Sequence, residues 1–139
     1  MKKQVTDSGY VIRLEKGEKF VDTLVSFCED EGVVGAVFTG IGSAESVELG
    51  FYNPPSKSFS FKIFDEALEV IGMNGNISIV DEKPFIHAHG TFSDNKFQTI
   101  GGHIKDFVVG PTVEIFLTNL NTEIGRKMDK EIGLKLLDI

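Results

Sequence analysis

All three histidines of this chain lie in one short stretch, PFIHAHGTFSDNKFQTIGGHI, which runs from Pro84 to Ile104. His87 and His89 are separated by a single residue, and His103 comes near the end of the stretch. Neutral imidazole is a common ligand of zinc, nickel, copper and iron, and three such ligands with an open fourth position form the pattern of reactive zinc sites. Three histidines can equally be unrelated polar side chains, so the elements that carry them decide whether they converge.

The stretch is typical of a β-hairpin, with polar residues between two strand-like segments. Asparagine tolerates the left-handed conformation that a three-residue hairpin loop needs, so we expect residues 94–96 to form the loop. The expected cross-strand pairs are then Ser93 with Phe97, His89 with Gly101, and His87 with His103.

The expected hairpin has one polar face and one apolar face. Residues two apart along a strand share a face, and directly opposed residues share it too. All three histidines fall on the polar face, where Gly101 opposite His89 would leave room for a small ligand. A two-residue loop would move His103 to the other face, so this interpretation depends on the register. The expected core face is Ile86, Ala88, Gly90, Phe92, Gln98, Ile100, Gly102 and Ile104.

The whole chain, residues 1–139, is expected to form one α+β domain. Phe20, Leu24 and Phe27 recur every three to four positions, as in an amphipathic helix, and Gly32 offers a C-terminal stop. The later apolar segments follow one another too closely for intervening helices, so most of the sheet should be antiparallel. The expected strands are 10–15, 33–38, 47–51, 59–63, 68–71, 77–80, 85–92, 97–104, 113–118 and 134–137, and 122–128 could form a short helix.

Composition bounds the environment of the protein. No apolar run reaches the roughly 20 residues that cross a bilayer, and the first residues lack the apolar segment of a secretory signal. Cys28 is the only cysteine, so no internal disulfide can form. Because Cys28 also shares the apolar stripe of the expected helix, we expect a buried structural thiol. These features favour a cytoplasmic protein without a membrane partner.

The charge argues against direct DNA binding. The chain has 14 Lys and Arg against 21 Asp and Glu, which gives a formal net charge of −7. The basic residues are scattered, and only Lys2-Lys3 and Arg126-Lys127 are adjacent. Affinity for nucleic acid usually depends on a basic footprint that neutralises phosphates, and the sequence offers none.

The segment Gly40-Ile41-Gly42-Ser43 could be mistaken for a phosphate-binding loop. A dinucleotide loop continues into a helix whose N-terminus meets the phosphates, whereas the alternating residues 47–51 predict a strand. We therefore expect a turn at 40–43, and Ser43 could border a ligand pocket.

Three charged residues lie within otherwise apolar strand segments. The solvated face of the sheet is the expected position of Glu69 and of Glu114. A carboxylate near three histidines could nonetheless act as a fourth ligand, as a partner of a ligand or as a general base. Arg13 could pair with one of these carboxylates or hold an anion, and the sequence does not place any of the three beside the histidines.

The stretch PFIHAHGTFSD…IGGHI resembles the histidine-bearing stretch of the PPC domain (plants and prokaryotes conserved). The resemblance continues in order through YVIRLEKGEKF, GAVFTGIGSAESVELGFYN, LEVIGMNGNIS and GPTVEIFLT, and so covers nearly the whole chain. It implies one main helix packed on a mostly antiparallel sheet and assembly into a homotrimer. For stand-alone bacterial and archaeal members with His-x-His…Gly-Gly-His, it implies a bound metal, zinc or another divalent transition metal, at His87, His89 and His103.

The same resemblance brings a DNA-binding description that this sequence does not match. In land plants the domain follows an AT-hook in nuclear proteins, but this chain has no Arg-Gly-Arg core, and Gly125-Arg126-Lys127 does not replace it.

Two functions remain. The first is a trimeric metal-binding module whose open site recognises a small anionic ligand or performs a simple hydrolysis. The second is a DNA-associated regulatory protein or protein-interaction scaffold, and the gathering of every histidine on one face favours the first.

Overall fold

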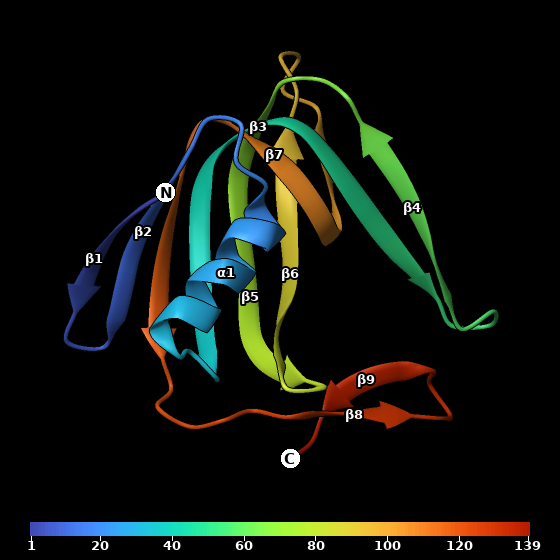
Figure 1. Ribbon diagram of the computed structural model, residues 1–139. Helices are drawn as coiled ribbons and strands as arrows, with labels where there is room; N and C mark the ends of the chain where they lie inside the picture. Colours follow the sequence, from blue (N-terminus) through green and yellow to red (C-terminus); the bar gives the residue numbers. More distant parts are fainter.

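The computed structural model describes the whole chain, from Met1 to Ile139, and shows an α+β fold with one helix and nine strands (Figure 1). Seven strands form one sheet and the last two form a separate hairpin. All the strand pairs are antiparallel, as expected. No helix has the length and apolar character needed to span a membrane. The elements are β1 (Lys2–Thr6), β2 (Gly9–Glu15), α1 (Phe20–Glu31), β3 (Ala36–Asn53), β4 (Ser58–Phe64), β5 (Leu68–Val80), β6 (Lys83–Ser93), β7 (Thr99–Asn119), β8 (Arg126–Asp129) and β9 (Leu134–Leu137).

Helix α1 packs across one face of the sheet and buries the apolar stripe that its sequence predicts (Figure 1). It ends at Gly32, whose φ of 65° is left-handed and whose N–H donates to the carbonyl of Cys28. Such a glycine is a common helix stop, so the predicted C-terminus is confirmed. Cys28 is buried, and burial raises the pKa of its thiol to about 12, which leaves it protonated and unreactive.

Several segments that look like separate strands belong to single long strands. Residues 36–38 and 47–51 are both part of β3, and β5 and β7 likewise each unite two expected strands. The turn expected at 40–43 is wrong, because this segment lies inside β3, where the register shifts between Gly40 and Gly42. Gly42 has a φ of 149°, and a Cβ there would lie 2.3 Å from the carbonyl oxygen of Thr112. The small residues therefore serve a β-bulge that bends the strand.

The two longest strands close the sheet on itself. Strand β3 pairs with β5 and β7, and β6 pairs with the other sides of β5 and β7. These four strands form a closed ring of pairings, and the last part of β3 continues with β4 as an arm that leaves the ring (Figure 1). A core cluster of 25 buried residues fills the molecule, including Phe20 of α1, Met73 of β5 and Phe92 of β6.

The C-terminal segment differs from its expected structure. The short helix expected at 122–128 is wrong, because residues 126–129 form β8, which pairs with β9. The backbone here is held in an extended form by β5, since the N–H of Ile79 donates to the carbonyl of Ile124 at 2.7 Å. The closing strand expected at 134–137 is confirmed as β9.

We expect Phe20→Ala to lower the free energy of unfolding by about 3–5 kcal/mol, the usual effect of deleting a buried phenyl ring. Phe20 is fully buried, and its ring stacks on Phe107 with centres 4.7 Å apart. Chemical denaturation measures the loss. Phe97→Ala is the control, because Phe97 is 89% exposed, and it should change stability by less than about 0.5 kcal/mol. Equal effects of the two substitutions would contradict this description of the core.

Candidate metal centre

The three histidines stand side by side on the paired strands β6 and β7. His89 lies directly opposite His103, and Ser93 lies opposite Thr99. The loop of the hairpin therefore has five residues, not the expected three, and each expected pair is shifted by two positions. A shift of two keeps every side chain on its face, so the three histidines share one face, as the alternating pattern predicts.

The longer loop has a local cause. Asp94 Oδ1 accepts hydrogen bonds from the backbone N–H groups of Lys96 at 2.8 Å and Gln98 at 2.9 Å. Phe97 takes a φ of 60° and projects into solvent. Because the aspartate side chain replaces backbone pairing here, strand β7 begins two residues later than expected.

The imidazole rings of the histidines form a nearly equilateral triangle. Their centres are 5.2 Å apart for His87 and His89, and 5.3 Å apart for each of these with His103. One nitrogen of each ring lies within 4.8 Å of the corresponding nitrogens of the other two rings. The hairpin therefore groups all three imidazoles around a common position on one face of the sheet.

This spacing fits a tetrahedral ion. A zinc-bound imidazole nitrogen lies about 2.0–2.1 Å from the metal, which puts the ring centre about 3.2 Å away and two such centres about 5.2 Å apart. The rings already have this separation. The nitrogens, which lie within 4.8 Å of one another, would have to approach to about 3.4 Å around the ion, and rotation of the side chains would bring them closer.

His103 carries a buried nitrogen without a partner. Its Nδ1 is buried and forms no hydrogen bond. A buried polar atom left unsatisfied costs about 1–3 kcal/mol, and such atoms are rare in folded proteins. A metal ion bound at this Nδ1 would remove the deficiency, so the donor set fits a metal.

The surroundings of His87 and His103 favour the neutral form of these two imidazoles. Burial, followed by the charge of Arg126 and the other two histidines, lowers the pKa of His87 to about 4. Burial, and then His89, also lower the pKa of His103. A neutral imidazole has the lone pair that a metal needs, so the lowered pKa of each side chain favours the form that binds a metal.

Two neighbours were not evident from the sequence. Arg126 of β8 approaches His87, with 3.3 Å between its Nη2 and the imidazole Nδ1. Phe59 of β4 packs against His103, with ring centres 5.0 Å apart. Arg126 is 39 residues from His87 and Phe59 is on the arm, so no local spacing reveals either contact.

A polar hollow of about 310 Å³ lies beside His89, the one exposed histidine. It has no hydrophobic residue in its lining, and its glycines leave the space above the strands free of side chains. Gly101 borders this hollow, although it pairs with Thr91 and not with His89. The lining residues are Gly72, Asn74, His89, Gly90, Thr91, Gly101 and Gly102.

The four other candidate residues lie in two pairs elsewhere on the sheet. Arg13 is opposite Glu114 on β2 and β7, and Ser43 is opposite Glu69 on β3 and β5. Glu69 also faces a residue of β6 that is four positions from His89, about 13 Å along a strand. The structure brings the three histidines together and leaves these four side chains apart from them. Glu69 and Glu114 are solvent-exposed, as expected.

Comparisons with known proteins agree with the fold. Residues 1–121 match the family model of the Plants and Prokaryotes Conserved (PCC) domain. A search of the curated proteins gave no match. Several similar solved structures from bacteria and archaea cover almost the whole chain.

A protein from Ralstonia eutropha JMP134, provisionally described as DNA-binding, shares 34% identity over 99% of this chain and 96% of its own, with a TM-score of 0.93. A metal-containing protein from Archaeoglobus fulgidus shares 31% identity over 99% of both chains, with a TM-score of 0.88. A plant- and prokaryote-conserved (PPC) protein from Pyrococcus horikoshii shares 29% identity over 99% of this chain and 95% of its own, with a TM-score of 0.89. The resemblance seen in the sequence is thereby confirmed, and this chain belongs to the Plants and Prokaryotes Conserved domain family.

Proposed function

We propose that this protein binds one zinc ion per chain through His87, His89 and His103 and uses the open coordination position to bind a small anionic ligand. The triangle of ring centres, spaced as a tetrahedral ion requires, is the observation that carries this proposal. The metal-containing relative from Archaeoglobus fulgidus supports it. Zinc suits three imidazoles, and other divalent transition metals are the alternatives.

The absence of acidic residues from the cluster favours an anionic ligand. Only the three histidines belong to it, so the protein supplies no negative charge to offset a divalent ion. A bound zinc ion supplies Lewis acidity, which polarises a ligand oxygen or acidifies a bound water. The cluster contains no carboxylate that could act as general base, so we propose ligand binding and assign no reaction.

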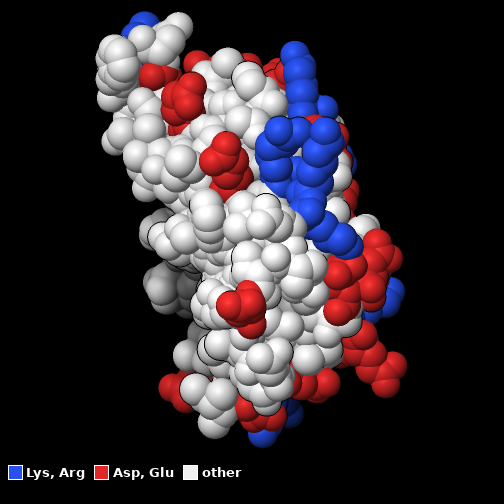
Figure 2. All heavy atoms as spheres, turned by 90° about the vertical axis from the view of Figure 1, so that its left-hand side faces the viewer, with Lys and Arg blue, Asp and Glu red and all other residues white.

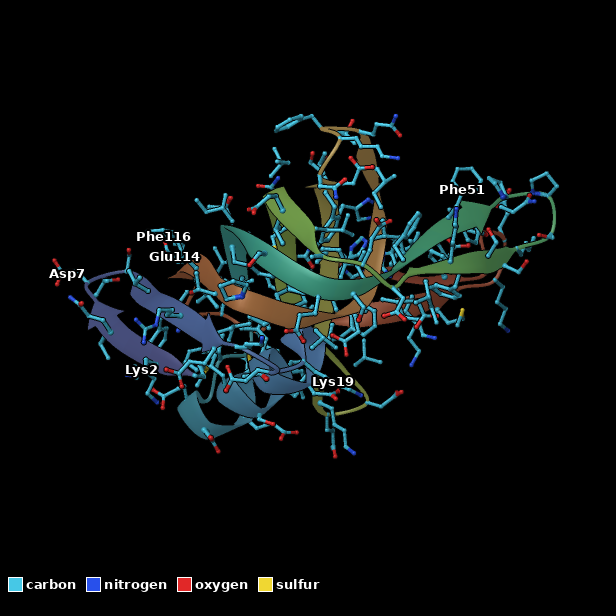
Figure 3. All side chains as sticks on the ribbon, turned by 90° about the horizontal axis from the view of Figure 1, so that it is seen from above. Lys2, Asp7, Lys19, Phe51, Glu114 and Phe116 are labelled. Carbon is cyan, nitrogen blue, oxygen red and sulfur yellow. The ribbon has the colours of Figure 1, made fainter.

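We propose further that the protein is a homotrimer. Phe116 of β7 is 56% exposed and lies on the side of the sheet away from α1 (Figure 3), whereas its neighbours Ile115 and Leu117 are buried. Phe116 is opposite Thr39 of β3, and the adjacent same-face residues of that strand, Val37 and Ile41, are also exposed. An exposed apolar patch of this kind is typical of a protein interface, and copies of the same chain are the proposed occupants, in line with the family resemblance.

DNA is a less favoured partner, although the Ralstonia eutropha relative is provisionally described as DNA-binding. Figure 2 shows Lys and Arg gathered at one edge of the molecule, with Asp and Glu beside them. Lys2 of β1 and Arg13 of β2 both pair with Glu15. With a net charge of −7 and its basic edge already paired, the chain has little free positive charge to offer phosphates.

Purified protein made without a histidine tag should contain about one transition metal per chain, mainly zinc. His87→Ala and His89→Ala should each reduce the metal content to background, because two remaining imidazoles form a weak site. Mass spectrometry of the metals measures this, and circular dichroism reports on folding. Thr91→Ala on the same face is the matched control and should keep its metal. Undiminished metal in both folded histidine variants would exclude the site.

Light scattering at micromolar concentration should give three times the chain mass of 15.3 kDa. Phe116→Asp should shift the protein toward the monomer, because a buried unpaired carboxylate is costly at an apolar interface. Phe97→Asp is the matched control, since this exposed phenylalanine lies on the β6–β7 turn. A wild-type mass equal to one chain would rule out the trimer.

Generic duplex DNA should bind more weakly than about 0.1 mM at physiological salt, the weak end of ordinary non-specific binding. The reason is the repulsion between the phosphates and an acidic surface, which a recessed divalent ion does not reverse. Fluorescence anisotropy with random-sequence duplex at several salt concentrations measures this affinity. Salt-sensitive micromolar binding would instead favour the regulatory function.

A further inference from the structure

Arg126 is held rigidly beside the histidines by groups that are all uncharged. Its Nε donates to Ser78 Oγ at 2.8 Å, its Nη1 to the carbonyl of Lys135 at 2.9 Å, and its Nη2 to Asn76 Oδ1 at 2.9 Å. The guanidinium also stacks on Phe85, 5.1 Å from the ring centre. These contacts fix the position of the cation and leave its charge in place.

No carboxylate neutralises this charge. Arg126 takes part in none of the ion pairs of the chain, although it is half-buried and an arginine remains protonated at any ordinary pH. A half-buried cation without a counter-ion is unfavourable. An anion from solution would offset this cost, and the neighbouring histidines already mark the place as a ligand site.

The contact between Arg126 and His87 is incompatible with metal binding. Arginine can only donate, so the Nδ1 of His87 must accept in this contact. A neutral imidazole has one lone pair. If Nδ1 binds the ion, the lone pair is used, and if Nε2 binds it, Nδ1 carries the proton. In both cases the metal takes the acceptor away, and one N–H of the guanidinium is released next to the ion.

We propose that metal loading converts Arg126 into the anion-binding residue of the site. The N–H that His87 can no longer accept donates to an oxygen of a carboxylate or phosphate group, whose second oxygen contacts the ion. A hydrogen bond from a guanidinium to an anionic oxygen is roughly twice as strong as one between neutral groups, for carboxylate and phosphate alike. The inference rests on the proposed metal site and adds to it the ligand class and the residue that selects it.

This arrangement makes metal and anion binding mutually dependent. Without an anion, the ion and the guanidinium repel each other and Arg126 weakens metal binding. An anion that lies between them is attracted both by the metal ion and by the guanidinium of Arg126, and these attractions offset the repulsion. Linkage then requires that the anion strengthens metal binding by the same factor by which the metal strengthens anion binding.

Cobalt(II) replaces zinc as the probe, because its visible spectrum changes when a ligand binds the ion. Acetate and inorganic phosphate are titrated separately into cobalt-loaded wild type, Arg126→Met and Arg126→Lys. Arg13→Met is the matched control, since it removes the same charge from an exposed position on β2. The anion concentration at half-maximal spectral change should rise about tenfold in Arg126→Met, less in Arg126→Lys, and stay constant in Arg13→Met.

Cobalt affinity gives a second readout that a purely structural arginine would not change. In wild type, acetate or phosphate should tighten cobalt binding, and this gain should be lost in Arg126→Met. An anion midpoint that is the same in folded Arg126→Met and wild type would overturn the inference, as would a wild-type spectrum that responds to neither anion. If Arg126→Met does not fold, Arg126→Lys decides. A higher anion concentration at half-maximal spectral change than in wild type supports the inference, and an unchanged concentration overturns it. Failure of wild type to bind cobalt would instead remove the metal site itself.

Discussion

The pairing of β6 with β7 is the constraint on which the site depends. It sets His89 opposite His103, and the alternation along β6 places His87 on the same face. Strand β7 also pairs with β2 and β3, which fixes its register. A slip of one residue would turn its buried side chains to the solvent face and break the register with β2, β3 and β6. The rigidity of the closed sheet is thus the reason that three imidazoles stand at ligand spacing before any metal arrives.

Much of this could be predicted from local patterns. The stripe that includes Phe20 predicts α1, and the alternation around His87 and His89 predicts their face even though the assumed loop was too short. The loop is two residues longer than expected, and side chains along a strand repeat their direction every two residues. The predicted face of the histidines is therefore unaffected. The bulge at Gly42 was misjudged as a turn, since small residues serve both structures and only the neighbouring strands distinguish them.

The surroundings of the histidines could not be predicted in this way. Arg126 reaches His87 because residues 124–126 lie against the end of β5, a placement that depends on backbone hydrogen bonds between distant segments. The local pattern of residues 122–128 allows a short helix, and only the contact of this segment with β5 shows that it is extended. Sequence patterns indicate which residues share a face of one element. The residues that contact a site from other elements depend on how those elements pack together.

The family model ends at residue 121, and Arg126 lies beyond it. The histidines and the cation beside them are therefore encoded in different parts of the chain: the scaffold that matches the family model and a tail that includes the β8–β9 hairpin, which the similar solved structures also cover. Exchange of the tail alone could alter what the site accepts and leave the scaffold intact. In this arrangement the ligand preference can change through substitutions in the β8–β9 segment, outside the strands that carry the three histidines.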